Sequence, residues 1–189
     1  MICISACVRS TSRVPRLAPL RAATKTDKRR GMTEYKIPES VLVVIHTAGC
    51  DVLLLERADH PGFGQSVTGS RDSIDEPFTQ TCRREVLEET GIDCLADDVQ
   101  LTDWQQTNRF AIFKHWANRF APGTTHNTEH VFGLLLPDKR AVTIAPDEHL
   151  RYQWLGWREA IDVCFSWTNV AAIRQLPERV AGAAGVTGR

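Results

Sequence analysis

A chain of 189 residues, 42% of them hydrophobic, is long enough to bury the core of one domain without disulfide or metal staples. Its formal net charge is zero, but residues 1–31 hold eight Lys/Arg and only Asp27, so the remainder carries 15 basic against 22 acidic residues. An acidic body argues against nucleic acid as a partner, and no apolar run approaches the ~20 residues that would span a bilayer.

Composition divides the chain into three parts. Residues 1–31, rich in Arg, Ser, Thr and Ala, are typical of an organellar transit segment, but they would also arise from a start codon assigned too early, with Met32 the true beginning. We favour Met32, because everything after it resembles one compact domain. In both cases we expect 1–31 to be a disordered basic extension, 32–180 to form the domain, and the Gly/Ala-rich residues 181–189 to be a flexible tail.

The cysteines indicate the compartment. Six are scattered without a C-x-x-C pair, which favours reduced thiols over disulfides or zinc ligands and predicts a cytoplasmic protein. They are Cys3, Cys7, Cys50, Cys82, Cys94 and Cys164. The six histidines show no ligand spacing and receive no role.

The elements predicted in chain order form an α/β arrangement. A β-branched run at 41–45 predicts a buried strand, followed by a turn at 46–51 and a partner strand at 52–55. Similar runs predict strands at 65–68, 99–104, 109–113, 115–120, 129–136 and 151–155, with a turn at 121–124. Longer stretches predict a helix after Pro77 and two more at 157–164 and 168–176. These elements fit a mixed sheet between helices.

The helix after Pro77 has recognisable ends. Pro77 suits the first turn behind a carboxylate, Glu76, which can cap the helix, and Gly91 lies where a helix stops. An apolar stripe at every fourth residue predicts the face that packs on the core: Phe78, Cys82 and Val86.

The same helix concentrates acids. Glu85 and Glu89 are four residues apart and share one face, Glu88 lies on the flank, and Arg84 stands at ion-pair spacing from Glu88. Three glutamates so close repel one another unless a cation neutralises them. Because all the ligands are oxygens, magnesium is the cation that suits them best.

The run R-E-V-L-E-E-T-G-I, residues 84–92, resembles the second half of the Nudix hydrolase signature without exception. The first half departs, because six residues rather than five separate Gly69 from Glu76. Either the loop carries one extra residue, or Asp75 replaces the first glutamate. The resemblance implies the Nudix fold, a mixed β-sheet sandwiched between α-helices, and magnesium-dependent hydrolysis of a triphosphate.

A wider resemblance, over residues 34–177, narrows to the branch that hydrolyses dihydroneopterin triphosphate in folate synthesis. The matching stretches are Tyr35-Lys36, Gln65 to Ser70, Ala121 to Thr124, Asn127 to Glu129, Glu148 to Leu150, and Ser166-Trp167 with Asn169. One departure is Phe63-Gly64, where that branch has an aromatic pair. A missing tryptophan there could loosen the packing or the substrate pocket.

The resemblance implies a metal site and a substrate site. The metal ligands would be Glu85, Glu89 and Glu148, with Mg²⁺ as cofactor and Mn²⁺ able to substitute, although the residues alone make Glu148 a solvated loop acid beside Asp147. The substrate contacts would be Lys36, Arg57, Thr68, Phe110, Ala111, Ile112, Phe113 and Ser166. Cations suit a triphosphate and aromatic faces suit a flat heterocycle, but without the resemblance the phenylalanines could equally be core and the lysine a surface residue.

The expected reaction releases pyrophosphate and a monophosphate, with Glu88 as the proton acceptor. The alternative roles for Glu88 are an ion pair with Arg84 or metal binding. A purine nucleotide such as dATP is an alternative substrate, since a purine and a pterin are similar bicycles. A catalytically silent nucleotide-binding module is a third hypothesis, which the intact signature disfavours. We expect a small-molecule triphosphate as the partner, neither nucleic acid nor membrane, and the oligomeric state stays open.

Overall fold

The computed structural model describes residues 35–186, with the side chains of the last helix described as far as residue 182. The predictions for residues 1–31, including Cys3 and Cys7, therefore lie outside the described residues, as do residues 187–189.

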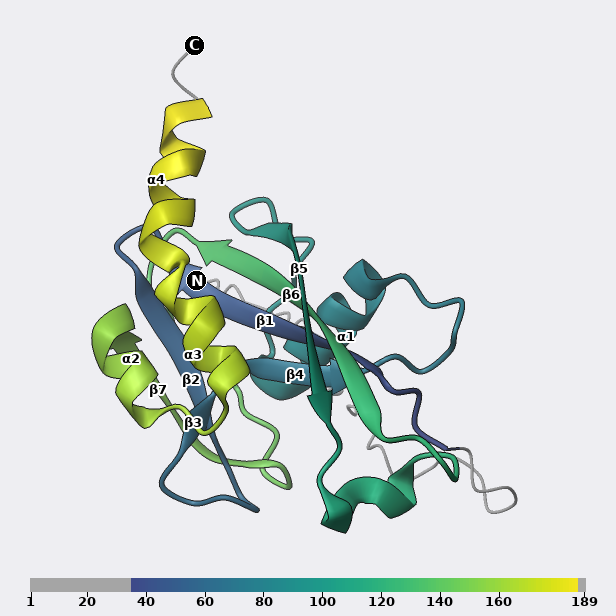
Figure 1. Cartoon of the computed structure of the whole chain (residues 1–189). Helices are drawn as coiled ribbons and strands as arrows, with labels where there is room; N and C mark the ends of the chain where they lie inside the picture. The colour runs from purple at the N-terminus through teal and green to yellow at the C-terminus, as the bar shows by residue number, and fades with distance from the viewer. Residues whose placement is uncertain (1–34, 187–189) are drawn as a thin grey trace, which may run out of the picture. The chain divides into compact units, whose positions relative to one another are not determined.

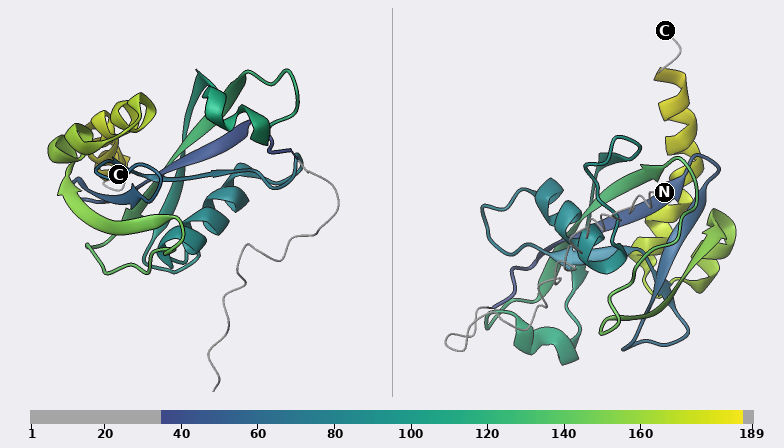
Figure 2. Two further views of the ribbon diagram at one scale, coloured as in Figure 1. Left: turned by 90° about the horizontal axis from the view of Figure 1, so that it is seen from below. Right: turned by 180° about the vertical axis from the view of Figure 1, so that it is seen from behind.

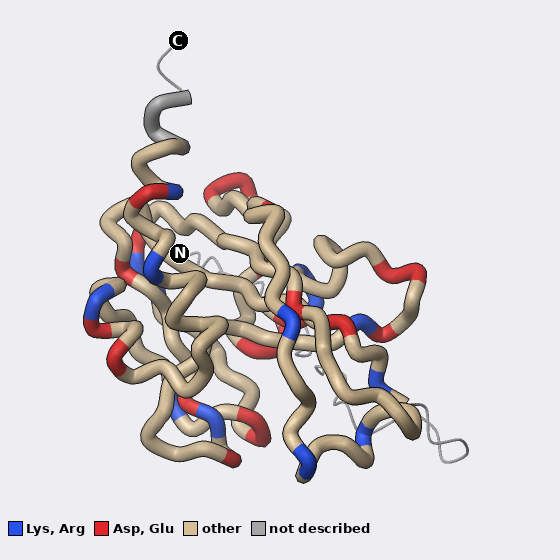
Figure 3. The backbone as a smooth tube through the Cα atoms, in the orientation of Figure 1, with Lys and Arg blue, Asp and Glu red and all other residues tan. Residues whose placement is uncertain are grey.

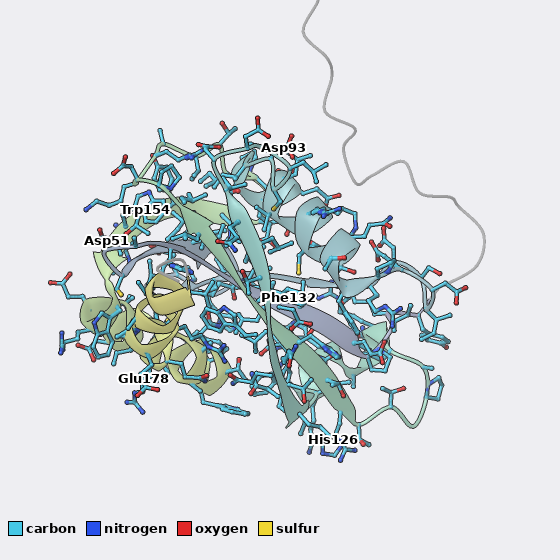
Figure 4. The ribbon with its side chains drawn as sticks, turned by 90° about the horizontal axis from the view of Figure 1, so that it is seen from above. Asp51, Asp93, His126, Phe132, Trp154 and Glu178 are labelled. Atoms are coloured by element: carbon cyan, nitrogen blue, oxygen red, sulfur yellow. The ribbon has the colours of Figure 1, made fainter. Side chains whose placement is uncertain are left out.

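Strand β1 (Glu39–Thr47) lies at the centre of the sheet (Figure 1). Along one edge it pairs in parallel with β6 (His126–Leu136), and β6 pairs in turn with antiparallel β5 (Gln100–Ala111). Along β6, His126 lies near one end of the sheet and Phe132 lies in the core (Figure 4). The β-branched run predicted as a buried strand is therefore the middle of β1.

The other edge of β1 is shared by two strands. The first half of β1 pairs with β4 (Val67–Ser70), whereas its end pairs with β2 (Asp51–Arg57), both antiparallel. Strand β2 also pairs with β7 (His149–Gly156) and with the short β3 (Gly64–Gln65). The sheet therefore forks at β1, with β4 on one branch and β2, β3 and β7 on the other.

Helices cover both faces of the sheet (Figures 1 and 2). Helix α1 (Phe78–Thr90) packs on one face, whereas α2 (Trp157–Val163), α3 (Trp167–Arg174) and α4 (Leu176–Val186) lie on the other. Alternate residues of β1 supply the two cores. The α1 core takes Val41, Val43 and Ile45, and the other takes Leu42 and Val44. This arrangement confirms the predicted mixed sheet between helices.

Three predictions about elements were wrong. The two strands expected at 99–104 and 109–113 are one strand, β5, whose pairing with β6 is irregular between Asp103 and Gln106. The strand expected at 115–120 is a 3₁₀ helix, η2 (Lys114–Arg119). Its aromatic residues pack on one another instead of on a neighbouring strand, as in the edge-on contact of Phe113 with Trp116.

Helix α4 continues to Val186, past residue 181, where a flexible tail was expected. Leu176 is fully buried and Val180 packs against the same core, so tertiary contacts hold a helix that its glycines would weaken.

Within the described range, none of the helices has the length and apolarity that crossing a membrane requires. The four cysteines in this range are free. Cys82 and Cys94 are buried, and Cys50 and Cys164 are partly buried.

Candidate active site

Helix α1 ends as predicted but begins differently. Gly91 adopts a left-handed conformation (φ 72°) and its N–H donates to the Leu87 carbonyl. At the other end Pro77 is the N-cap, and no side chain caps the helix. The cap expected from Glu76 is therefore wrong, since that carboxylate accepts the backbone N–H of Asp72 at 2.6 Å instead.

The same carboxylate decides between the two alignments of the signature loop. Glu76 is buried, with Oε1 3.4 Å from Nε of Arg84, whereas Asp75 is exposed. Glu76 therefore occupies the place of the first signature glutamate. The loop from Gly69 carries one extra residue, and this residue is accommodated before the helix without displacing the helical acids.

Arg84 joins the loop to the helix. Its Nη2 donates to the Ser70 carbonyl at 2.9 Å, and its Nη1 lies 2.5 Å from Oε1 of Glu85 and 3.7 Å from Oε2 of Glu88. Burial lowers the pKa of Arg84, but the surrounding carboxylates, Glu85 foremost, raise it overall. The guanidinium therefore remains charged and holds the acidic helix face against β4.

Glu85 lies directly across the backbone of Gly69. A Cβ atom at Gly69 would stand 1.9 Å from Cδ of Glu85, so the close approach of α1 to β4 requires glycine at this position. Glu85 itself is buried, at 4% exposure. The signature's glycine and its glutamate thus form one contact between strand and helix.

A second group of potential ligands joins α1 to the start of β7. Ligand atoms of Glu89, Glu148 and His149 lie within 4.8 Å of one another. Glu89 is buried and Glu148 is exposed. The Glu148 carbonyl accepts the Ala58 N–H at 2.9 Å, which fixes the loop to the end of β2. The structure therefore brings Glu148 to the helix acids, although nothing in the local sequence marks it.

His149 is a residue that the sequence analysis left without a role. Its Nε2 lies 3.1 Å from Oε2 of Glu89, and both side chains are buried. The only sequence signal was its position directly after Glu148, which does not reveal a contact with a helix 60 residues away.

The donor set fits a hard divalent cation. Carboxylate oxygens from α1 and from the 148 loop face one another, which is the ligand chemistry that magnesium prefers. Glu85 is not in the group of Glu89, Glu148 and His149, and its Oε1 accepts from Arg84. Two of the three predicted ligands are thus together, and the third lies one helical turn away on the same face.

Arg57 lies at the same end of β2. Its guanidinium donates to both oxygens of Asp59, at 2.5 and 2.6 Å. These bonds raise the pKa of Arg57 most, and the charges of Glu89 and Glu148 add to them. The guanidinium also lies 5.7 Å from the centre of the Trp116 ring. A cation is therefore held close to the carboxylates by an acid partner and an aromatic face.

The remaining predicted substrate contacts are dispersed. Phe113 is half-exposed and contacts Trp116, whereas Phe110 is half-buried and pairs with Asn127 across the sheet. Ala111 is exposed, Ile112 half-buried, Thr68 half-buried in β4, and Lys36 exposed with its N–H donating to the Arg119 carbonyl at 2.8 Å. Acidic and basic positions are interspersed along the backbone of the described residues (Figure 3).

Ser166 has a structural task. Its hydroxyl accepts the backbone N–H of Asn169 and so caps α3, and Asn169 Oδ1 accepts the Ser66 N–H at 2.7 Å. The matching Ser-Trp-x-Asn stretch is therefore explained in part by the junction between α3 and the strand that leads to Gly69.

Gly64, part of the departure from the expected aromatic pair, is closely packed. A Cβ there would stand 3.0 Å from Cδ1 of Leu54, and the neighbouring Phe63 contacts Phe165 edge-on. Phe165 also stacks on His60 at 4.6 Å between ring centres. Gly64 is therefore closely packed against β2, whereas Phe63 and Phe165 are half-exposed.

Glu129 is a buried carboxylate that the sequence analysis did not single out. It is 4% exposed and accepts from Asn108 Nδ2 at 3.2 Å. Burial raises the pKa of Glu129, against the opposing effect of hydrogen bonds from Asn108 and Thr168. These bonds tie β6 to β5 and to the start of α3.

Comparison with known proteins agrees with this fold. The NUDIX domain family model matches residues 36–176, so the chain belongs to this family and is a Nudix hydrolase. The dihydroneopterin triphosphate diphosphatase of Escherichia coli (strain K12) is 46% identical over 143 residues, covering 75% of this chain and 93% of that protein. The protein of the same name from Haemophilus influenzae is 38% identical over 145 residues, with 76% and 90% covered.

A solved structure, that of the E. coli dihydroneopterin triphosphate pyrophosphohydrolase, superposes with a TM-score of 0.68 at 46% identity. It covers 75% of this chain and 95% of its own. The fold of this chain is therefore that of the Nudix family.

Proposed function

We propose that this protein hydrolyses dihydroneopterin triphosphate to dihydroneopterin monophosphate and pyrophosphate, with Mg²⁺ as its cofactor and Mn²⁺ as a substitute. The observation that carries the proposal is the approach of Glu148 to Glu89 from a separate loop, beside a complete signature helix. The named E. coli and H. influenzae relatives, matched over nine-tenths or more of their length, support the choice of substrate.

In this proposal Glu85, Glu89 and Glu148 would hold the cation. When bound, a divalent ion offsets phosphate charge and lowers the pKa of a coordinated water. The carboxylates come from both sides of the site, so that they can meet a polyphosphate between them. Arg57, oriented by Asp59, binds phosphate oxygens with its planar donors, and Lys36 adds a second cation.

Glu88 is the proposed proton acceptor. It stands on the flank of α1 within ion-pair range of Arg84, and its side chain is 40% exposed, so it can reach a water beside the buried acids. The water gives its proton to Glu88, and its oxygen bonds to one of the two phosphorus atoms of the α–β bridge while the bond from that phosphorus to the bridging oxygen breaks, which separates pyrophosphate from the monophosphate. Positioning and charge stabilisation suffice for such a transfer. Phe110 and Phe113 are the proposed stacking faces for the pterin.

The test is product identification. The protein is incubated with Mg²⁺ and dihydroneopterin triphosphate, or with each dNTP, in ¹⁸O-labelled water, and the products are analysed by mass spectrometry. We expect pyrophosphate and the monophosphate, with the label showing which phosphorus was attacked. Release of orthophosphate, or no turnover of the pterin where dNTPs react, would contradict the proposal.

A purine triphosphate such as dATP is the second candidate, because the half-exposed Phe113 offers a face to any flat bicycle. A higher kcat/KM for dATP than for the pterin in the same experiment would favour it. The free cysteines agree with the proposed cytoplasmic location.

A further inference from the structure

His149 is held rigidly at the point where the 148 loop becomes β7. Its backbone N–H donates to the Ala145 carbonyl at 2.9 Å, and it pairs with Arg57 across β2 and β7. Only 3% of the residue is exposed. The imidazole therefore has a fixed place between the sheet and α1, and water has almost no access to it.

The two ring nitrogens have different surroundings. Nε2 lies 3.1 Å from Oε2 of Glu89, whereas Nδ1 is buried without a hydrogen-bond partner. A proton on Nε2 is donated to a carboxylate, and Nδ1 then keeps only an unused lone pair. A proton on Nδ1 alone would be a buried donor with no acceptor, which is the costlier arrangement. It would also leave the Glu89 carboxylate facing the lone pair of Nε2. The geometry therefore selects the tautomer that carries its proton on Nε2.

This tautomer argues against His149 as a metal ligand, although its ring lies within 4.8 Å of both carboxylates. Coordination through Nε2 would require the proton to move to the partnerless Nδ1. Coordination through Nδ1 would use the ring nitrogen that does not contact Glu89, because Nε2 makes that contact. A group that donates to a carboxylate ligand instead orients it.

We propose that His149 is a positioning residue that fixes the Glu89 carboxylate and sets its separation from Glu148. Because His149 follows Glu148 directly, one hydrogen bond joins the loop that carries Glu148 to the helix that carries Glu89. An apolar residue would fill the same space without leaving Nδ1 unsatisfied, so the packing alone does not require histidine. This inference rests on the metal site of the proposed function and assigns that site a residue beyond its carboxylates.

The test is Mn²⁺ affinity, measured by electron paramagnetic resonance of the free ion, in three variants of the full chain. His149→Gln can place its amide nitrogen where Nε2 stands, His149→Asn places it near Nδ1, and His149→Leu has no donor. We expect wild-type-like affinity for the glutamine variant and a 10- to 100-fold loss for the other two, the range known for such supporting residues. Asp147→Asn, an exposed neighbour, is the control and should bind as wild type does.

Each outcome of these measurements supports or contradicts the inference. Nitrogen coupling from a coordinated imidazole in the pulsed spectrum of bound Mn²⁺ would make His149 a ligand and overturn the inference. Unchanged affinity in the asparagine variant, with melting temperatures equal to wild type, would overturn it too. An affinity loss in the glutamine variant equal to that of the asparagine variant would also count against it. If the wild-type chain binds no Mn²⁺, the proposed metal site itself is wrong and the inference fails with it.

Discussion

At the scale of single residues, the site combines acids of different exposure. Glu85 and Glu89 are buried on one face of α1, whereas Glu88 and Glu148 reach solvent. Burying carboxylates is costly unless they meet hydrogen-bond donors or cations. Arg84 meets this need for Glu85, and His149 meets it for Glu89. Whether each glutamate also binds the cation is tested by substitution.

Glu85→Gln and Glu89→Gln should each reduce Mg²⁺-dependent kcat by ~10²-fold or more while the fold survives, because the amide keeps the shape and loses the charge. The double variant should lose much less than the product of the two single losses, since both acids serve one cluster. Steady-state kinetics at saturating Mg²⁺ measures both effects, and near wild-type turnover in either single variant would rule out that ligand.

Glu148→Gln should lower kcat strongly and raise the Mg²⁺ concentration for half-maximal rate. The free energy of unfolding of this variant should change by no more than about half a kcal/mol, as for an exposed side chain. Asp147→Asn is the matched control, because both residues are exposed and adjacent. Identical behaviour of the two variants in metal titrations would make Glu148 the solvated loop acid that its local sequence suggests.

Glu129→Gln should raise the melting temperature at pH 7. Burial raises the pKa of Glu129 in the folded protein above its value in the unfolded chain, so the native state is penalised when the carboxylate is charged. The penalty is complete above the folded-state pKa and disappears as pH falls below the ordinary glutamate value. Melting curves from pH 7 to 4 should therefore converge for the two proteins, and a gap that widens at low pH would refute this explanation.

At the scale of elements, α1 could be predicted well because its signals are local. The period of the apolar stripe, the terminal glycine and the acid spacing all lie within one stretch, and the structure bears them out. Element η2 could not be predicted, because the aromatic residues between 115 and 120 favour a strand by their propensity. Its conformation depends on distant partners such as the Arg57 guanidinium over Trp116.

The candidate site likewise combines residues whose positions follow from local sequence with residues whose positions depend on tertiary contacts. The position of Glu85 and Glu89 on one helix face follows from helical spacing, whereas the approach of Glu148 and His149 to Glu89 depends on β2 and β7 pairing across about a hundred residues. Only the family resemblance pointed to Glu148, and nothing in the sequence pointed to the Glu89 contact of His149.

The contact between β4 and α1 gives a prediction for Gly69→Ala. The added methyl group would overlap the end of the Glu85 side chain, which can swing away more easily than the backbone can move. We expect kcat to fall by ~10²-fold, as for loss of Glu85, with a stability loss of about 1 kcal/mol. Kinetics and thermal melting together check this. A fully active variant would show that the Glu85 conformation is irrelevant to turnover.

At the scale of the whole molecule, the family match begins at residue 36 and ends at residue 176, close to the expected domain. A chain that starts at Met32 should therefore fold and turn over like the full chain. Activity and melting temperature of the two proteins, measured side by side, test this. A drop of more than a few degrees in the shorter protein would mean that residues 1–31 contribute to the stability of the domain.

The fork at β1 has a consequence for how the site would respond to a bound cation. Gly69 and Glu85 belong to the β4 branch, whereas Arg57 and Glu148 belong to the branch of β2 and β7. The two branches share the edge of β1, are joined in sequence at Ser66 between β3 and β4, and are linked by the contact of His149 with Glu89. A small change in twist at the fork would therefore change the separation of Glu148 from the helix acids. A cation bound between the acids of the two branches would then draw the branches together, because these carboxylates repel one another when no cation lies between them.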